Sequence, residues 1–224
     1  MSFNKLVVIV VLVLFSASTI PLELMAGSKV KLARLKYAGG GDWYNDPSSE
    51  VNLLKFVAQN TTIQVEPKYE FVDIKSDNIF LYPMIFMTGH GSIDFSGEDG
   101  KKLRAYIENG GFLYVDDDYG MDEYFKKEIK KIFPDAELKD VPLNHPIFNI
   151  KYSFPKGVPK IHEHDDKNPQ TKGIFLNGRL CLVYTIESNP SDGWADAEVH
   201  SDNAEKRLAS LQFGTNLILY ALSN

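Results

Sequence analysis

The sequence predicts an α/β fold: a three-layer sandwich with a mostly parallel, doubly wound sheet and a C-terminal β-hairpin. Two observations carry this prediction. Short apolar segments alternate with amphipathic ones from residue 29 to about residue 133, the order expected of strands and helices in a parallel sheet covered on both faces. Further along, the Asn177-Gly178 pair separates two apolar segments, which is typical of a hairpin.

Local patterns set the boundaries of these elements. Strands are predicted over residues 29–37, 69–74, 81–88, 112–115, 174–176 and 180–185, and helices over residues 48–59, 98–108, 122–133 and 203–222. Segment 81–88 is almost wholly apolar, as expected of a strand buried on both faces. Asp46-Pro47 is typical of a helix N-cap followed by proline. Residues 140–172 are rich in Pro and Asn and predict a long excursion from this pattern.

The amino-terminal segment has the pattern of an export signal. Lys5 precedes an unbroken apolar run from Leu6 to Phe15, and small residues follow. The run is shorter than the roughly 20 apolar residues that span a bilayer. We therefore expect residues 1–26 to be a signal peptide and residues 27–224 a single exported α/β domain. The alternative is an uncleaved segment, which would then be the protein's attachment to a membrane.

Composition excludes two classes of function. Lys and Arg number 24 against 30 Asp and Glu, so the formal net charge is −6. Because non-specific nucleic-acid binding needs a surplus of cations, we expect no nucleic-acid partner. The single cysteine, Cys181, excludes an internal disulfide and a thiolate-cluster zinc site. Its place in an apolar hairpin strand predicts a small buried side chain.

Small and polar residues follow three successive predicted strands. They are Gly39-Gly40-Gly41-Asp42, Gly89-His90-Gly91 and Asp116-Asp117-Asp118. In open α/β sheets, ligands bind beyond the carboxyl ends of the strands, where the strand order reverses. The sequence therefore predicts a ligand-binding site at one edge of the sheet, with the candidate residues Gly40, Asp42, His90, Asp116, Asp117 and Asp118.

Each strand end has a chemical and a structural interpretation. The triple glycine either lets backbone amides approach a ligand or makes a tight turn. His90 stands where a nucleophile elbow has its nucleophile, which disfavours a serine or cysteine hydrolase and leaves a metal ligand, a general base or a hydrogen-bonding fixture. Asp116 and Asp118 share one face of a strand and could bind a hard cation. The alternative is one capping and two solvated carboxylates.

A second polar segment, His162-Glu163-His164-Asp165-Asp166, lies in the excursion. Two histidines two residues apart could share one face of an extended segment and bind a metal ion. However, no other ligand is tied to them by its spacing in the sequence. We therefore expect a solvated loop here.

The motifs together resemble the family called domain of unknown function 4159, over about residues 29–223. The resemblance rests on Gly89-His90-Gly91, Leu103-Arg104-Ala105-Tyr106, Asp116-Asp117-Asp118, His145-Pro146-Ile147-Phe148, Arg179, Asp192-Gly193-Trp194 and Gly214-Thr215-Asn216. It implies a flavodoxin-like fold of the class I glutamine amidotransferase-like type and a place in the bacterial envelope, either periplasmic or extracellular. It implies no glutaminase activity, because the elbow cysteine of true amidotransferases is His90 here. It also adds His145, Arg179 and Trp194 to the candidate edge cluster.

Three functions stay open at this stage. The first is an exported envelope protein that binds a small ligand or an envelope partner at the sheet edge, without covalent chemistry. The second is a hydrolase that depends on a divalent metal held by His90, Asp116, Asp118 and His145. The third is a structural scaffold of an envelope complex. The sequence identifies no substrate and no certain cofactor, and it does not decide whether the protein is an enzyme.

Overall fold

The computed structural model describes residues 29–162 and 164–223, which form an α/β sandwich around one mixed sheet. The sheet has seven strands in the order β2-β1-β3-β4-β7-β6-β5. Its parallel strands are β1 (Leu32–Lys36), β2 (Phe71–Asp73), β3 (Met84–His90), β4 (Phe112–Tyr119) and β7 (Arg179–Ile186). The antiparallel strands β6 (Gln170–Leu176) and β5 (Lys139–Asp140) complete one edge.

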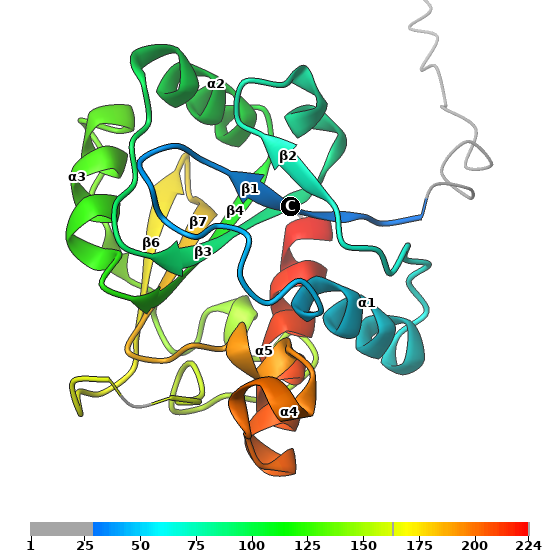
Figure 1. The fold of residues 1–224 in the computed structure, drawn as a ribbon. Coiled ribbons are helices and arrows are strands. Elements are labelled where there is room, and N and C mark those ends of the chain that lie inside the picture. Colours follow the sequence, from blue (N-terminus) through cyan, green and yellow to red (C-terminus); the bar gives the residue numbers. More distant parts are fainter. Residues whose placement is uncertain (1–28, 163, 224) are drawn as a thin grey trace, which may run out of the picture.

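Helices cover both faces of the sheet (Figure 1). On one face, α2 (Gly97–Glu108) and α3 (Asp122–Ile132) pack against β1, β3, β4 and β7. On the other face, α1 (Ser49–Asn60) and the long α5 (Ala204–Leu222) pack against the same strands. Apolar side chains alternate between the two faces along each strand, so each face has a core of its own. The strand order is that of a doubly wound, flavodoxin-like sheet.

The predicted fold class is therefore confirmed, including the hairpin, in which β6 and β7 pair on either side of Asn177-Gly178. One local prediction is wrong: Asp46 does not cap α1. The N-cap is Ser48, and Asp46 has a φ of +43° before it. The structure adds three 3₁₀ turns, η2 (Asp77–Leu81), η3 (Pro146–Phe148) and η4 (Asp192–Trp194), and the short helix α4 (Ala197–His200).

The described residues do not test the amino-terminal prediction. The expected signal peptide, residues 1–26, lies outside the described residues. Among the helices of the described ranges, none combines the length and the apolar character needed to cross a bilayer.

Candidate functional site

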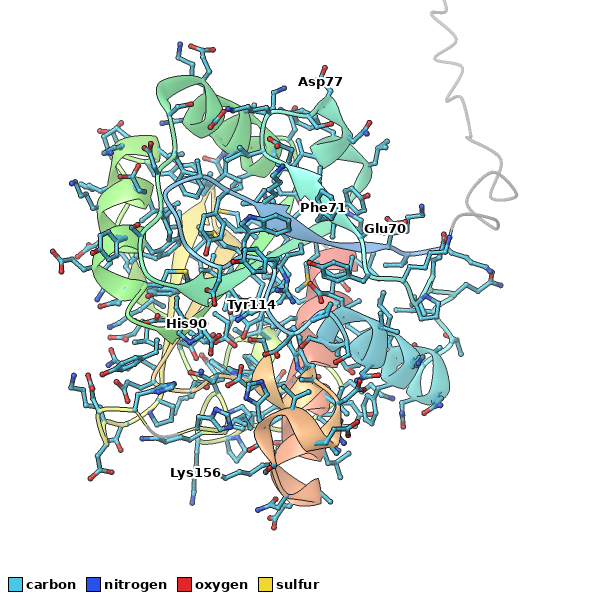
Figure 2. All side chains as sticks on the ribbon, in the orientation of Figure 1. Glu70, Phe71, Asp77, His90, Tyr114 and Lys156 are labelled. Carbon is cyan, nitrogen blue, oxygen red and sulfur yellow. The ribbon has the colours of Figure 1, made fainter. Side chains whose placement is uncertain are left out.

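The candidate site lies where the winding of the sheet reverses. In the sheet, β2 lies on one side of β1, and β3, β4 and β7 follow on the other side, so the chain crosses back over β1 between β2 and β3. The loops that leave the carboxyl ends of β1 and β3 therefore diverge to opposite sides of the sheet, and the crevice between them is where doubly wound folds bind ligands. Figure 2 shows His90 at the end of β3, well away from Glu70 and Phe71 at the β2 edge.

Glycines bring the loops after β1 and β3 into direct contact. A Cβ atom on Gly89 would lie 2.4 Å from the Tyr37 hydroxyl, and one on Gly41 would lie 2.9 Å from the carbonyl oxygen of His90. Gly41 donates its backbone N–H to Ser92. The triple glycine thus serves close packing of two loops, which is the structural interpretation of that motif.

This packing places Asp42 against His90. Asp42 Oδ1 accepts a hydrogen bond from the backbone N–H of His90 at 2.5 Å, and Asp42 Oδ2 lies 3.0 Å from His90 Nδ1. The side chain of His90 is 52% exposed. One carboxylate therefore fixes the imidazole through its Nδ1 atom, and the ring itself faces solvent.

The three aspartates at the end of β4 divide between the two faces of the sheet, as their alternation predicts. Asp116 accepts hydrogen bonds from the Thr185 hydroxyl at 2.5 Å and from the Ser191 backbone at 2.8 Å. Asp117 accepts a hydrogen bond at 2.9 Å from the backbone N–H of Met121, the N-cap residue of α3. All three aspartates are buried, so the interpretation with two solvated carboxylates is wrong.

Asp118 connects His90 to the rest of the site. Its Oδ2 atom lies 3.5 Å from His90 Nδ1 and accepts a hydrogen bond from Asn45 Nδ2 at 2.5 Å. Its Oδ1 atom accepts from Asn189 Nδ2 at 2.8 Å. The same Asn189 amide lies 3.2 Å from Asp192 Oδ2, so it bridges two carboxylates.

A buried ion pair supports the loop that carries Asn45. The Arg34 guanidinium donates to both carboxylate oxygens of Glu50, at 2.5 and 2.9 Å, and neither side chain is exposed. Arg34 also donates to the backbone of Trp43 at 3.0 Å and to the side chain of Asn45 at 2.9 Å. Because Arg34 takes the Asn45 amide oxygen, the Asn45 NH₂ group is left to point at Asp118.

The group with the clearest metal-binding geometry is His162, Asp192 and His200. One ligand atom from each lies within 4.8 Å of the others. His162 Nδ1 lies 2.7 Å from Asp192 Oδ2, and His200 Nε2 lies 3.9 Å from Asp192 Oδ1. Bonds of about 2.0–2.1 Å to a tetrahedral ion separate its ligand atoms by roughly 3.3 Å, which falls between these two distances.

Two more carboxylates contact this His162–Asp192–His200 triad. Asp46 Oδ2 lies 2.7 Å from His200 Nε2 and pairs with it. Asp202 Oδ1 lies 3.3 Å from His162 Nε2, the nitrogen that faces away from Asp192. Such a carboxylate behind a metal-bound histidine fixes its tautomer and orientation. The second oxygen of Asp202 is buried and has no hydrogen-bond partner.

Burial and the density of carboxylates shift the pKa values of the site. Burial raises the pKa of Asp116 to about 7, and burial together with the charge of Asp192 raises that of Asp118 to about 7. A hydrogen bond to Asp46 raises the pKa of His200 to about 9. Partial burial opposes the charged form of His90, but the carboxylates of Asp118 and Asp42 outweigh it and raise its pKa.

Several predicted residues lie elsewhere. Arg179 is the first residue of β7, at the opposite end of the sheet, and donates to the carbonyl oxygens of Ile107 and Gly111. His145 precedes η3, with its ring beside those of Phe175 and Tyr220. These positions follow from the parallel pairing of β7 with β4. The start of β7 lies beside the start of β4, whereas His90 lies near the end of β4. Placing them in one edge cluster with His90 is therefore incorrect.

Two other candidates lie near the site without contributing a side chain to its surface. Trp194 is fully buried, donates its indole N–H to the Ser210 carbonyl and packs against Phe86 and Tyr114. It therefore supports η4 from the core. Gly40 lies in the exposed loop with a φ of +97°, a conformation that favours glycine.

The structure also changes the expectation for His162. The prediction of a solvated loop is wrong at this position, because His162 is partly buried against Asp192 and Asp202. Sequence reasoning missed Asp192 and His200 as site residues and gave Asp46 a capping role. The sequence signal for a metal site was the His162-Glu163-His164 pattern. The partners of His162, Asp192 and His200, come from η4 and α4, and no local pattern linked these segments to it.

Comparison with known proteins agrees with the resemblance noted from the motifs. The family model described as "Domain of unknown function (DUF4159)" matches residues 31–222, so the chain belongs to that family. No curated protein matches the chain.

Proposed function

We propose that this member of the DUF4159 family is a hydrolase that depends on one divalent transition-metal ion. Its ligands are His162, Asp192 and His200, and the fourth position is left open for water or substrate. The observation that carries the proposal is the convergence of three ligand atoms within 4.8 Å at the switch-point edge of the sheet. The hypothesis of a metal-dependent hydrolase therefore stays at the same edge of the sheet. Its ligands differ from those expected from the sequence, which were His90, Asp116, Asp118 and His145.

The donor set supports a zinc-class ion. Imidazole nitrogen and carboxylate oxygen are its common ligands, and catalytic sites use three protein ligands with one open position. The side chains of His162 and His200 are 25% and 23% exposed, whereas Asp192 is 3% exposed. One side of the triad is therefore anchored in the protein and the other can meet solvent. An ion there lowers the pKa of a bound water and polarises a carbonyl group.

The neighbourhood supports hydrolysis over metal storage. Asn189, which bonds Asp192, has a φ of +50°, and Asp46 has a φ of +43°. Backbone in this region costs on the order of 1–3 kcal/mol and is often found at functional sites. His90 and Asp42, both open to solvent, lie on the other side of Asp118 from the triad. A storage site has no need of such a group.

Metal analysis tests the first half of this proposal. The chain is purified without a polyhistidine tag or chelator, and bound metal is quantified by mass spectrometry. We expect about one Zn²⁺ per chain, and a loss of affinity greater than about 100-fold in H162A or D192A, because even outer-shell changes cost 10–100-fold. The matched control is H145A, a histidine at the other end of the sheet, which should bind normally.

Three outcomes are informative. Equal metal binding by H162A and H145A would contradict the site. Metal binding without hydrolysis of any ester or amide would leave the earlier hypothesis of a non-covalent binding protein. A chain that binds no metal, and melts at a much lower temperature when Asp192 is changed, would favour the scaffold hypothesis.

Export is a separate part of the proposal. The apolar run from Leu6 to Phe15 after Lys5 supports a cleaved signal and a place in the periplasm or outside the cell. The intact mass of the protein from its native host should correspond to a start between Thr19 and Lys29. A chain that keeps Met1 in the membrane fraction would contradict cleavage.

A further inference from the structure

We propose that a pocket beside the metal triad binds one uncharged sugar ring, packed on Tyr119. The pocket adjoins the triad because the His164 ring, which stacks on Tyr119, has its centroid 6.4 Å from that of His162. This binding site goes beyond the proposed hydrolysis and does not depend on it. Three features support it: the size of the pocket, the fixed position of the Tyr119 ring, and the hydrogen-bonding groups that are free to meet a ligand.

The pocket has a volume of about 260 Å³ and lies at the carboxyl ends of β4 and β7. Its walls include Tyr119 at the end of β4, Lys126 of α3, Lys167 in the loop before β6, Gln170 at the start of β6, and Glu187 just after β7. Ligand pockets in proteins typically measure about 300–1,000 Å³. A pocket just below this range has room for one ring.

The Tyr119 ring forms a fixed aromatic surface. One of its faces stacks on the His164 ring, with the ring centroids 4.7 Å apart, and its hydroxyl donates to Asp165 Oδ1 at 3.1 Å. Tyr119 is nevertheless 48% exposed, so the rest of the residue is open to a ligand. The C–H groups of a sugar ring are apolar and pack on aromatic rings, and an aromatic ring already held in place loses little entropy on binding.

The groups that are free to bond a ligand suit uncharged hydroxyls. Within the described residues, the side-chain amide of Gln170 has no hydrogen-bond partner, and it lines the pocket. Glu187 is buried, and its Oε2 atom accepts from the Asp165 backbone N–H at 3.2 Å, which leaves its other oxygen as a further acceptor. An amide both donates and accepts, and a carboxylate accepts, so these groups can pair with the hydroxyls of a sugar.

Charged ligands fit this pocket less well. Lys126 donates to Asp122 Oδ2 at 2.7 Å, and Lys167 donates to Asp165 Oδ2 at 2.8 Å. An anion would compete with a carboxylate for either lysine and would lie close to the carboxylate of Glu187. A cation would meet the two ammonium groups. Each paired lysine still has N–H bonds to offer a neutral hydroxyl.

Isothermal titration calorimetry on the purified chain tests the pocket with the methyl glycosides of glucose, galactose and mannose. At least one should bind, and Y119A should weaken its binding by about tenfold, because the aromatic surface is lost. Q170A should weaken it by about two- to tenfold, the worth of one hydrogen bond. The matched control is Y124A, which changes a similarly exposed tyrosine of α3 outside the pocket and should bind as the wild type does.

Two results would overturn the inference: no binding of any of the three glycosides, or equal affinities in the wild type, Y119A and Q170A. Tighter binding of glucosamine, lost in E187Q, would assign the pocket to an ammonium ligand instead. Tighter binding of glucose 6-phosphate, lost in K167M, would assign it to an anion. D192N removes a proposed metal ligand but should keep the sugar affinity, so the pocket and the proposed hydrolase can fail separately. A loss of sugar affinity in D192N would contradict a separate site.

Discussion

Histidine and other polar side chains lie at both ends of the parallel strands, but they pair with different groups. At the carboxyl ends they pair with carboxylates, and at the amino ends they bond backbone groups. At the carboxyl ends, His90, His162 and His200 pair with carboxylates and keep part of each ring in contact with solvent. At the amino ends, Arg179 donates to backbone carbonyls near the end of α2, and His145 accepts a hydrogen bond from the backbone N–H of Ile147.

The difference lies in what the polar atoms meet. At the amino ends, helix C-termini leave carbonyl oxygens without partners, and a cationic side chain satisfies them. At the carboxyl ends, side chains meet other side chains, and the burial of several carboxylates together raises their pKa values. Polar residues that satisfy backbone groups serve the fold, whereas a cluster that pays a desolvation penalty for buried charge is a candidate site.

The largest effect expected at the carboxyl end comes from the ion pair beneath the site. R34M leaves the Glu50 carboxylate buried without a partner and should destabilise the fold by about 3–5 kcal/mol. Urea denaturation measures the change. The double variant R34M/E50M should recover most of the loss, because an apolar pair of similar volume replaces the charged one. A double variant as unstable as R34M would show that the hydrogen bonds to Trp43 and Asn45 matter more.

The second effect is a pH dependence of stability that comes from Asp116. Its pKa rises from 3.8 to about 7 on folding because the carboxyl group is buried. The folded state therefore binds the proton more tightly, so its contribution to stability is full below about pH 4 and is lost as the pH rises through 7. The contribution is at most about 4 kcal/mol.

Urea denaturation from pH 4 to pH 8 measures this effect in wild type and D116N. The wild type should lose stability relative to D116N as the pH rises, and the difference should level off once the pH exceeds the folded-state pKa of about 7. A difference independent of pH would mean that Asp116 is ionised throughout.

A third, smaller effect tests the orienting carboxylate of the metal site. D202N removes the charge behind His162 Nε2 and should weaken zinc binding by about 10–100-fold, with little change in stability. Zinc titration against a competing chelator gives the affinity. An unchanged affinity would place Asp202 outside the metal site and leave His162 oriented by Asp192 alone.

The smallest effect is expected at the amino ends of the strands. R179M loses hydrogen bonds to backbone carbonyls near the end of α2 and should cost about 1–2 kcal/mol, because Arg179 is only partly buried. Thermal melting measures it, and zinc affinity should stay unchanged. A fall in zinc affinity in R179M would contradict the separation between the two ends.

The sequence alone determined the fold class and one half of the site. Strand and helix periods differ, and glycines mark strand ends, so local patterns were sufficient to predict the alternation of elements, the hairpin and the switch-point edge. They also placed Asp42, His90 and Asp118 on that edge. In the structure, the carboxylates of Asp42 and Asp118 both lie within 3.5 Å of His90 Nδ1.

Only the tertiary structure decided the other half. His162, Asp192 and His200 come from an irregular loop, a 3₁₀ turn and a four-residue helix, and Asp46 joins them from the loop before α1. Segments of this kind have no periodicity that predicts their direction. They meet because contacts such as Asn189 with Asp118, Asn52 with Trp194 and Ser48 with Asp196 tie distant loops together. Those contacts exist only once the sheet has placed β1, β4 and β7 side by side, which local sequence patterns do not encode.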